Sequence, residues 1–213
     1  MITNTLKALL LCVILSPLQT LSCPSVCTKN PRTILEETTE KINADILAFK
    51  KKNAQNDDQI NHSISKTSEE ILIPLIDIKS MVMHVIGRYH WKMSSKNEQK
   101  RFHKIFQQVV LREYTQFLVK TSHTKIKFAS SRTPNNTEYQ TIAAKAYIEE
   151  KPNDLIFYMK CSCDDAKQWK ITDITVDNVS YLDQYHLKYA ATIRNKGLKG
   201  LNNKLEDSLK ESI

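Results

Sequence analysis

The sequence predicts an α+β fold, in which N-terminal helices precede a twisted, mainly antiparallel four-stranded sheet and C-terminal helices that together enclose an apolar cavity. Apolar residues recur at helical spacing up to Thr121, and the period changes to two after His123. The stretch from Trp169 to Ser180 then predicts a strand, a turn at Asp177-Asn178 and a helix capped by Ser180. Helices that cover one face of a concave sheet can enclose a cavity.

Residues 1–22 are typical of a secretory signal peptide. Lys7 precedes the apolar run 8–15, and Pro17 and small residues near Ser22 follow it. That run is too short to cross a bilayer, which takes about 20 apolar residues. We therefore expect a signal peptide over 1–22 and a single exported, periplasmic domain over 23–213. A buried N-terminal helix and lipid attachment at Cys23 are the alternatives.

The helices are predicted in order from their caps and apolar faces. Pro31 begins the first helix, and a second helical segment runs from Ile60 to Leu72 before Pro74. Asp77 is expected to cap a third helix that continues to Met93. The spacing of Ser95 and Glu98 is that of a capping box, which begins the longest helix. If that helix reaches residue 121, it is about 40 Å long.

Four strands are predicted over residues 124–131, 137–149, 154–163 and 168–176. The intervening segments 134–136, 151–153 and 164–165 are short and rich in turn residues. Short connections favour an antiparallel meander because parallel neighbours need long crossovers.

The formal net charge is +8, and it falls to +7 when Lys7 leaves with the signal peptide. In an exported protein this basicity favours transient contact with anionic membranes or acidic protein surfaces and no nucleic-acid partner. A basic surface that is merely solvated is the alternative.

The cysteines Cys23, Cys27, Cys161 and Cys163 of the exported domain allow three full pairings in an oxidising compartment. The sequence does not choose among them. Cys161 and Cys163 continue the apolar row of a predicted strand, which favours small core residues over metal ligands. No other cluster completes a metal site, so no metal is expected.

Catalytic and nucleotide-binding motifs are missing from the sequence. With only three glycines, the chain lacks the GxGxxG, Walker-type and GxSxG loops. Its six histidines are scattered, and none pairs with a Ser or Cys nucleophile signature. We therefore expect neither an enzyme nor a cofactor, although an active site assembled from distant residues stays open.

Three stretches together resemble the MlaC family of periplasmic phospholipid-binding and toluene-tolerance proteins. They are residues 70–89 (EILIPLIDIKSMVMHVIGRY), the capped helix with Phe102, Phe106 and Tyr114, and residues 169–201. The most specific part is W-x-I-x-D-I-x-V-D-x-V-S, from Trp169 to Ser180. The family usually has Gly where this chain has Asn178, and often Arg where it has His186.

The resemblance implies a phospholipid carrier that moves lipid between an outer-membrane lipoprotein complex and an inner-membrane ABC transporter. Phospholipid would be its cargo, and no covalent chemistry would be required. A carrier of hopanoids or other hydrophobic ligands is one alternative. A small α+β pocket enzyme, isomerase-like or dehydratase-like, is another. A secreted eukaryotic binding module is a third, because Asn61, Asn135 and Asn178 begin glycosylation sequons.

The lipid-binding wall is predicted from apolar residues on helices and strands that would face one another. These are Val82, Ile86, Tyr89, Phe106, Val110, Tyr147, Phe157, Met159, Ile171 and Val179. Ordinary core packing is the alternative for each of them. A carrier should have a wall almost free of titratable groups, whereas an enzyme would bring His and Asp side chains together there.

Overall fold

The computed structural model describes residues 27–52, 57–121, 125–129, 137–148, 151–162 and 167–210. The predicted signal peptide, Cys23, Cys163 and the turns at 134–136 and 164–165 lie outside these ranges. Within them, no helix combines the length and the apolar character needed to cross a membrane.

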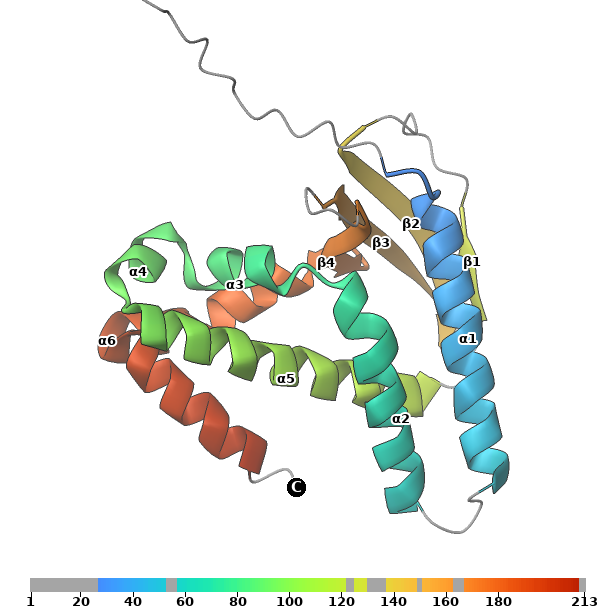
Figure 1. Ribbon diagram of the computed structural model, residues 1–213, viewed down its shortest axis with the longest axis horizontal. Coiled ribbons are helices and arrows are strands. Elements are labelled where there is room, and N and C mark those ends of the chain that lie inside the picture. Colours follow the sequence, from blue (N-terminus) through green and yellow to red (C-terminus); the bar gives the residue numbers. More distant parts are fainter. Residues whose placement is uncertain are drawn as a thin grey trace, which may run out of the picture.

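The helices occupy most of the chain and flank the sheet (Figure 1). In chain order they are α1 (Pro31–Lys52), α2 (Asp57–Leu72), the 3₁₀ turn η1 (Ile73–Leu75), α3 (Ile78–Ile86), α4 (Arg88–Met93), α5 (Lys96–Thr121) and α6 (Tyr181–Lys210). The non-helical backbone of Gly197, with φ 62°, kinks α6.

The predicted helix caps are present. Asp77 Oδ1 accepts a hydrogen bond from Ser80 N at 3.0 Å. At the start of α5, Ser95 N donates to Glu98 Oε2 at 2.7 Å, and Glu98 N donates to Ser95 Oγ at 3.2 Å. Ser180 Oγ accepts from Asp183 N at 3.1 Å and so caps α6. These side chains bind backbone N–H groups that have no partner inside the helix.

The single helix predicted from Asp77 to Met93 is wrong, because Gly87 divides it into α3 and α4. Gly87 has φ 78°, a conformation that L side chains rarely adopt, and its N–H still donates to Met83 O. The chain then turns into the short helix α4, whose direction differs from that of α3 (Figure 1).

The sheet is an antiparallel meander, as predicted, with five strands in the order β1-β2-β3-β4-β5 rather than four. The strands are β1 (Lys125–Phe128), β2 (Tyr139–Ile148), β3 (Lys151–Cys161), β4 (Trp169–Val176) and β5 (Val179–Ser180). Asp177 and Asn178, with φ of 48° and 65°, form the tight turn between β4 and β5. Asn178 therefore adopts the positive φ at which the family usually has Gly.

The predicted turn at 151–153 is wrong, since these residues begin β3. Lys151, Pro152 and Asn153 pair with Ile148, Tyr147 and Ala146 of β2. Proline is tolerated here because the register of β4 begins only at Leu155, which leaves the other side of this segment unpaired.

Helices cover one face of the sheet. Leu35 of α1, Phe106 of α5 and Tyr185 of α6 share one buried cluster with Ile142 and Phe157 of the sheet. The α1–α2 hairpin extends beyond the sheet and lies beside the end of α5 (Figure 1). It has a smaller core of its own, formed by Ile42, Ile46, Ile64 and Leu72.

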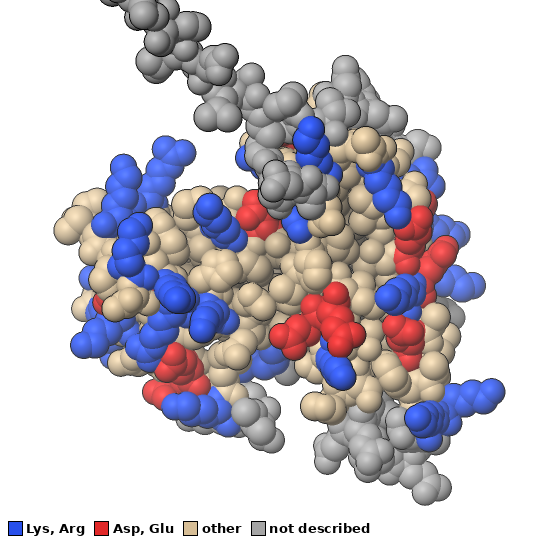
Figure 2. All heavy atoms as spheres, in the orientation of Figure 1, with Lys and Arg blue, Asp and Glu red and all other residues tan. Residues whose placement is uncertain are grey.

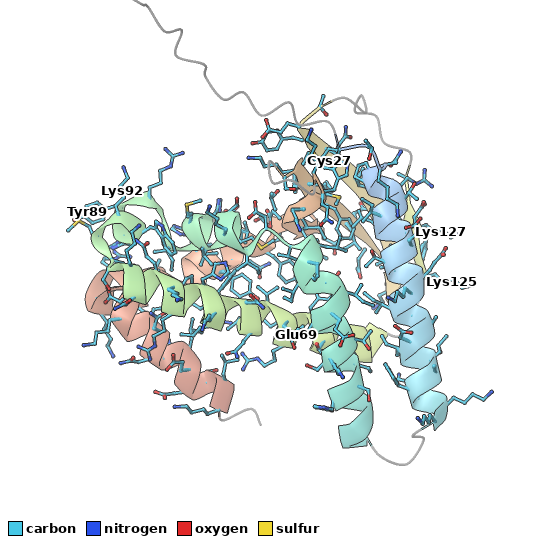
Figure 3. All side chains as sticks on the ribbon, viewed as in Figure 1. Cys27, Glu69, Tyr89, Lys92, Lys125 and Lys127 are labelled. Carbon is cyan, nitrogen blue, oxygen red and sulfur yellow. A yellow bond between two sulfur atoms is a disulfide. The ribbon has the colours of Figure 1, made fainter. Side chains whose placement is uncertain are left out.

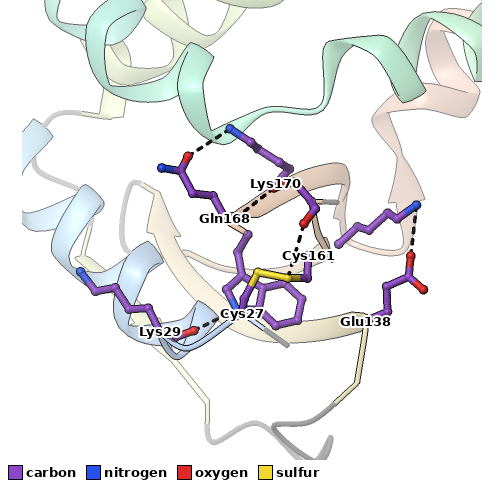
Figure 4. The surroundings of a disulfide bond; sticks show 9 residues. Cys27, Lys29, Glu138, Cys161, Gln168 and Lys170 are labelled. Atoms are coloured by element: carbon purple, nitrogen blue, oxygen red, sulfur yellow. Dashed lines mark hydrogen bonds and ion pairs between the residues drawn. A yellow bond between two sulfur atoms is a disulfide. The ribbon is translucent and has the colours of Figure 1, made fainter. Parts of the chain in front are cut away.

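A disulfide joins Cys27, just before α1, to Cys161 at the end of β3 (Figure 4). Beside it, Trp169 Nε1 donates to Lys29 O at 2.9 Å. The expectation that Cys161 is a small core residue is therefore incomplete, because this buried side chain is also half of a disulfide. The bond closes a long loop and fixes the start of α1 to the end of the sheet.

Candidate functional site

A cavity of about 450 Å³ lies between the helical layer and the inner face of the sheet, a volume within the usual range of small-molecule pockets. Its wall is mostly apolar. The lining comes from α2, the residue after η1, α3, α5, β1, β3, β4 and α6: Leu72, Ile76, Met81, Phe106, Val110, Glu113, Tyr114, Ile126, Leu155, Phe157, Ile171, Asp173, Ile174, Val176, Tyr181, Leu182 and Tyr185.

A β-bulge in β4 increases the apolar area of the wall. Met159 pairs with Ile171, but Tyr158 pairs with Asp173, so Thr172 is the extra residue. Directly opposed residues of an antiparallel pair share a face. The bulge shifts by one residue the alternation of side chains between the two faces of the sheet. Ile174 therefore lies on the cavity face with Ile171 and is opposite Phe157.

The size of the buried side chains differs along the inner face of the sheet. Ala144 and Ala146 of β2 are small and buried. At the other end, Met159 and Trp169 are almost completely buried beside the disulfide. Ala144 and Ala146 are thus packed core residues whose strand partners Leu155 and Ile126 line the cavity.

The wall also contains polar groups, which already have partners. The Tyr185 hydroxyl donates to the Glu113 carboxylate, which lies 3.8 Å from Lys188 Nζ. Asp173 accepts from Ile174 N at 2.8 Å, Ser180 Oγ at 2.7 Å and Leu182 N at 3.3 Å. These bonds join α5 to α6 and β4 to the start of α6, so both carboxylates have structural roles.

Tyrosines in and beside the cavity wall have raised pKa values. Burial raises the pKa of Tyr114 to about 12. Burial, followed by the hydrogen bond to Glu113, raises the pKa of Tyr185, and burial with the nearby Glu113 charge raises that of Tyr189. All three hydroxyl groups therefore stay neutral at physiological pH.

Four of the ten residues predicted to line the wall do lie on it: Phe106, Val110, Phe157 and Ile171. They come from α5, β3 and β4 and face the same cavity. Contact of these side chains with lipid stays a prediction.

The other six predicted residues lie elsewhere. Val82, Ile86 and Met159 are almost completely buried in the filled core. Tyr147 lies on the outer face of the sheet, because its neighbour Ala146 faces inward and Lys127 Nζ lies 5.3 Å from the Tyr147 ring centroid. Tyr89 and Val179 are exposed, on α4 and on the short β5. Their placement in the wall was wrong.

Sequence reasoning also missed wall residues. Met81 and Tyr114 stood on recognised helical faces, and their periodicity could have suggested them. Ile174 and Val176 could not be found from strict alternation, since the bulge reverses it. The prediction of a wall almost free of titratable groups was wrong, because Glu113 and Asp173 line it. The lining contains no histidine.

Metal chemistry finds no support in the described ranges, where no three His, Cys, Asp or Glu side chains are grouped so as to hold an ion. What the geometry provides is a partly open, mostly apolar cavity whose lining includes hydrogen-bonded polar groups. Such a site can hold a hydrophobic molecule without reacting with it.

Comparison with known proteins gives one consistent family. The family model described as "MlaC protein" matches residues 36–207. The intermembrane phospholipid transport system binding protein MlaC of Haemophilus influenzae is 20% identical over 190 residues, which cover 89% of this chain and 86% of that protein. The solved structure of a phospholipid-binding protein from Ralstonia solanacearum, in complex with a phospholipid, is 16% identical. It superposes with a TM-score of 0.72, over 84% of this chain and 96% of the other.

Proposed function

Since the chain belongs to the MlaC family, we propose that it is a phospholipid carrier that holds acyl chains in the apolar cavity beneath α5 and α6. The observation that carries the proposal is the cavity itself, which lies between the sheet and the helices of a fold shared with a phospholipid-bound protein.

The energetics of lipid transfer support a carrier. Burial of apolar surface is worth about 0.8 kcal/mol per CH₂, so two ordinary acyl chains represent roughly 20 kcal/mol of gross transfer free energy. A lipid therefore leaves a membrane and enters water far too rarely for unassisted transfer between two membranes. A carrier needs only to shield the chains, and the apolar residues contributed by β3, β4 and α5 provide such a surface.

The polar groups of the wall favour binding over catalysis. Glu113 and Asp173 are engaged by Tyr185, Ser180 and backbone N–H groups. Neither is paired with a histidine or a nucleophile in the lining. We therefore assign them to holding the wall together and infer that the protein is not an enzyme.

The transport route belongs to the proposal. The name of the Haemophilus influenzae relative, an intermembrane phospholipid transport system binding protein, supports a periplasmic location and transfer between the two membranes. We infer that residues 1–22 direct export. We further infer that the carrier exchanges lipid with an outer-membrane lipoprotein complex and an inner-membrane ABC transporter.

The test is to fill the cavity. Val110 of α5 is partly buried on the cavity wall, so Val110→Trp should reduce bound phospholipid at least severalfold while the fold is kept. Gln108→Trp, at an exposed position of the same helix, is the matched control and should leave lipid content unchanged. Lipid is measured by mass spectrometry of an organic extract, and folding by circular dichroism.

Unchanged phospholipid in folded Val110→Trp protein would remove this cavity as the lipid site. The same extract identifies the cargo. A hopanoid or another apolar molecule in place of phospholipid would keep the cavity but contradict the proposed substrate class.

A further inference from the structure

The short helix α4 presents both apolar and basic side chains at one end of the molecule, away from the residues that line the cavity. Tyr89 and Met93 are 70% and 71% exposed, and Arg88 and Lys92 are exposed beside them. We call these four residues the α4 surface. Figure 3 shows Tyr89 and Lys92 at this end, pointing away from the rest of the chain.

Helix geometry explains why these residues face solvent together. Trp91 is partly buried and packs against the main core, which fixes the inward side of α4. At about 100° per residue, Tyr89 and Met93 both lie about 160° from Trp91. They therefore form a pair on the outward side of the helix, and Arg88 and Lys92 lie between that pair and the core.

The α4 surface is held in place by hydrogen bonds. Gln99 Nε2 donates to Trp91 O at 2.6 Å and to Ser94 O at 3.2 Å. Ser94 Oγ donates to His90 O at 2.7 Å. With the positive φ of Gly87 at its other end, α4 is anchored on both sides. The exposure of Tyr89 and Met93 is thus a fixed feature of the fold.

Further cations surround the α4 surface. They are exposed residues of the first turns of α5 and of the kinked region of α6: Lys96, Lys100, Arg194, Lys196 and Lys199. None of them, nor Arg88 or Lys92, takes part in the salt bridges found among the described residues. Glu98 lies near Lys199, but its carboxylate accepts from Ser95. Lys and Arg side chains gather at this end of the molecule in Figure 2.

We propose that the α4 surface and these surrounding cations dock on an anionic phospholipid bilayer. Tyrosine and other amphipathic or apolar side chains enter the interfacial layer of a membrane, while Lys and Arg stay at the headgroups. Each cation held near an anionic surface strengthens binding by about fivefold. The cations lie on three elements around a projecting tip, an arrangement that a broad anionic surface can contact at once.

Vesicle sedimentation tests this proposal. The exported protein should bind vesicles of phosphatidylglycerol and phosphatidylethanolamine and should bind vesicles of phosphatidylcholine much more weakly. Tyr89→Ser combined with Met93→Ser, and separately Arg88→Gln combined with Lys92→Gln, should each weaken binding to the anionic vesicles by about tenfold or more. Circular dichroism establishes that each variant is folded.

Matched substitutions on α1 serve as controls. Leu47→Ser removes another exposed apolar side chain, and Lys51→Gln with Lys52→Gln removes two exposed cations. Both should bind as strongly as the unaltered protein. Equal weakening by the α1 and α4 charge variants would mean that net charge alone drives binding, and it would overturn the proposed site.

Two further measurements distinguish membrane docking from lipid loading of the cavity and from binding to an acidic protein. Val110→Trp should retain vesicle binding, because docking does not depend on cargo. If it loses binding, lipid loading explains the association and the docking site is rejected. Poly-glutamate is the probe for an acidic protein partner. Two results together would assign the α4 surface to an acidic protein instead of a membrane. Poly-glutamate would bind tightly only when Arg88 and Lys92 are present, and Tyr89→Ser with Met93→Ser would leave vesicle binding unchanged.

Discussion

At the scale of single residues, the wall of the cavity combines apolar side chains with tyrosines whose hydroxyl groups stay neutral. Tyr185 lines the wall and is 7% exposed, and the ring of Tyr189, a core residue 3% exposed, lies 5.8 Å behind it. The Phe106 ring contacts Tyr185 edge-on at 5.3 Å. Aromatic side chains of this kind provide a large apolar surface, and a single polar atom of Tyr185 binds Glu113.

The raised tyrosine pKa values predict a loss of stability at alkaline pH. Below about pH 10, tyrosine is neutral in both the folded and the unfolded chain and contributes no pH dependence. Above it, the unfolded chain loses protons that the folded chain retains, so stability falls as pH rises through about 12, the pKa of Tyr114. The free energy of unfolding should fall by up to about 1.4 kcal/mol per pH unit for each such tyrosine.

Urea unfolding at about pH 9 and at about pH 11 measures this slope. Tyr189→Phe removes one buried hydroxyl without altering the ring, so its slope should be less steep than that of the unaltered protein. Lysines also titrate in this range, and the comparison between the two proteins removes their contribution. An identical slope for Tyr189→Phe would contradict a raised pKa of Tyr189 in the folded protein.

At the scale of elements, Asp173 joins a strand, a turn and a helix. Its carboxylate accepts from the β4 backbone at Ile174, from Ser180 Oγ and from Leu182 N in the first turn of α6. The sequence pattern indicated that Ser180 caps this helix. It did not indicate that Asp173, seven residues earlier, holds the cap in place, because that contact depends on the turn that brings β4 beside the start of α6.

Asp173→Ala should therefore destabilise the protein by about 2 to 4 kcal/mol, since it leaves several donors without their charged acceptor. Asp183→Ala, which removes an exposed carboxylate of the same helix turn, should change the free energy of unfolding by less than about 1 kcal/mol. Urea unfolding of both variants gives the comparison. A small effect of Asp173→Ala would show that α6 does not depend on this carboxylate.

The disulfide is the other link between distant elements. It joins residues 134 positions apart, so in the chain-entropy account it stabilises the fold by about 4 to 5 kcal/mol. Cys27→Ser combined with Cys161→Ser should lower the free energy of unfolding by roughly 2 to 5 kcal/mol. Urea titrations of the double variant and of the reduced natural protein should agree. A double variant as stable as the oxidised protein would contradict this role.

Local chemistry predicted most elements but not the contacts that depend on tertiary packing. Ser95 with Glu98, and Asp177 with Asn178, carry their own cap and turn signals. Gly87 was overlooked because one glycine in a helical pattern is often tolerated. The pairing of Cys27 with Cys161 was open among three alternatives, since spacing in the sequence does not say which cysteines meet in space.

At the scale of the whole molecule, the cavity results from unequal filling of the space between the sheet and the helices. Trp169 and Met159 fill the end beside the disulfide, whereas side chains of β1, β3, β4, α5 and α6 surround the cavity. The sequence predicted that such a cavity would exist and identified four of its wall residues. It could not separate the wall from the filled core, because both are built from the same apolar residue types.

The central claim is that this cavity carries phospholipid, and the direct test is to purify the exported protein from a periplasmic extract without detergent. Native mass spectrometry of the intact protein, with analysis of its organic extract, counts and identifies what is bound. We predict close to one phospholipid per folded chain. A folded protein whose cavity is empty of any lipid would contradict the account.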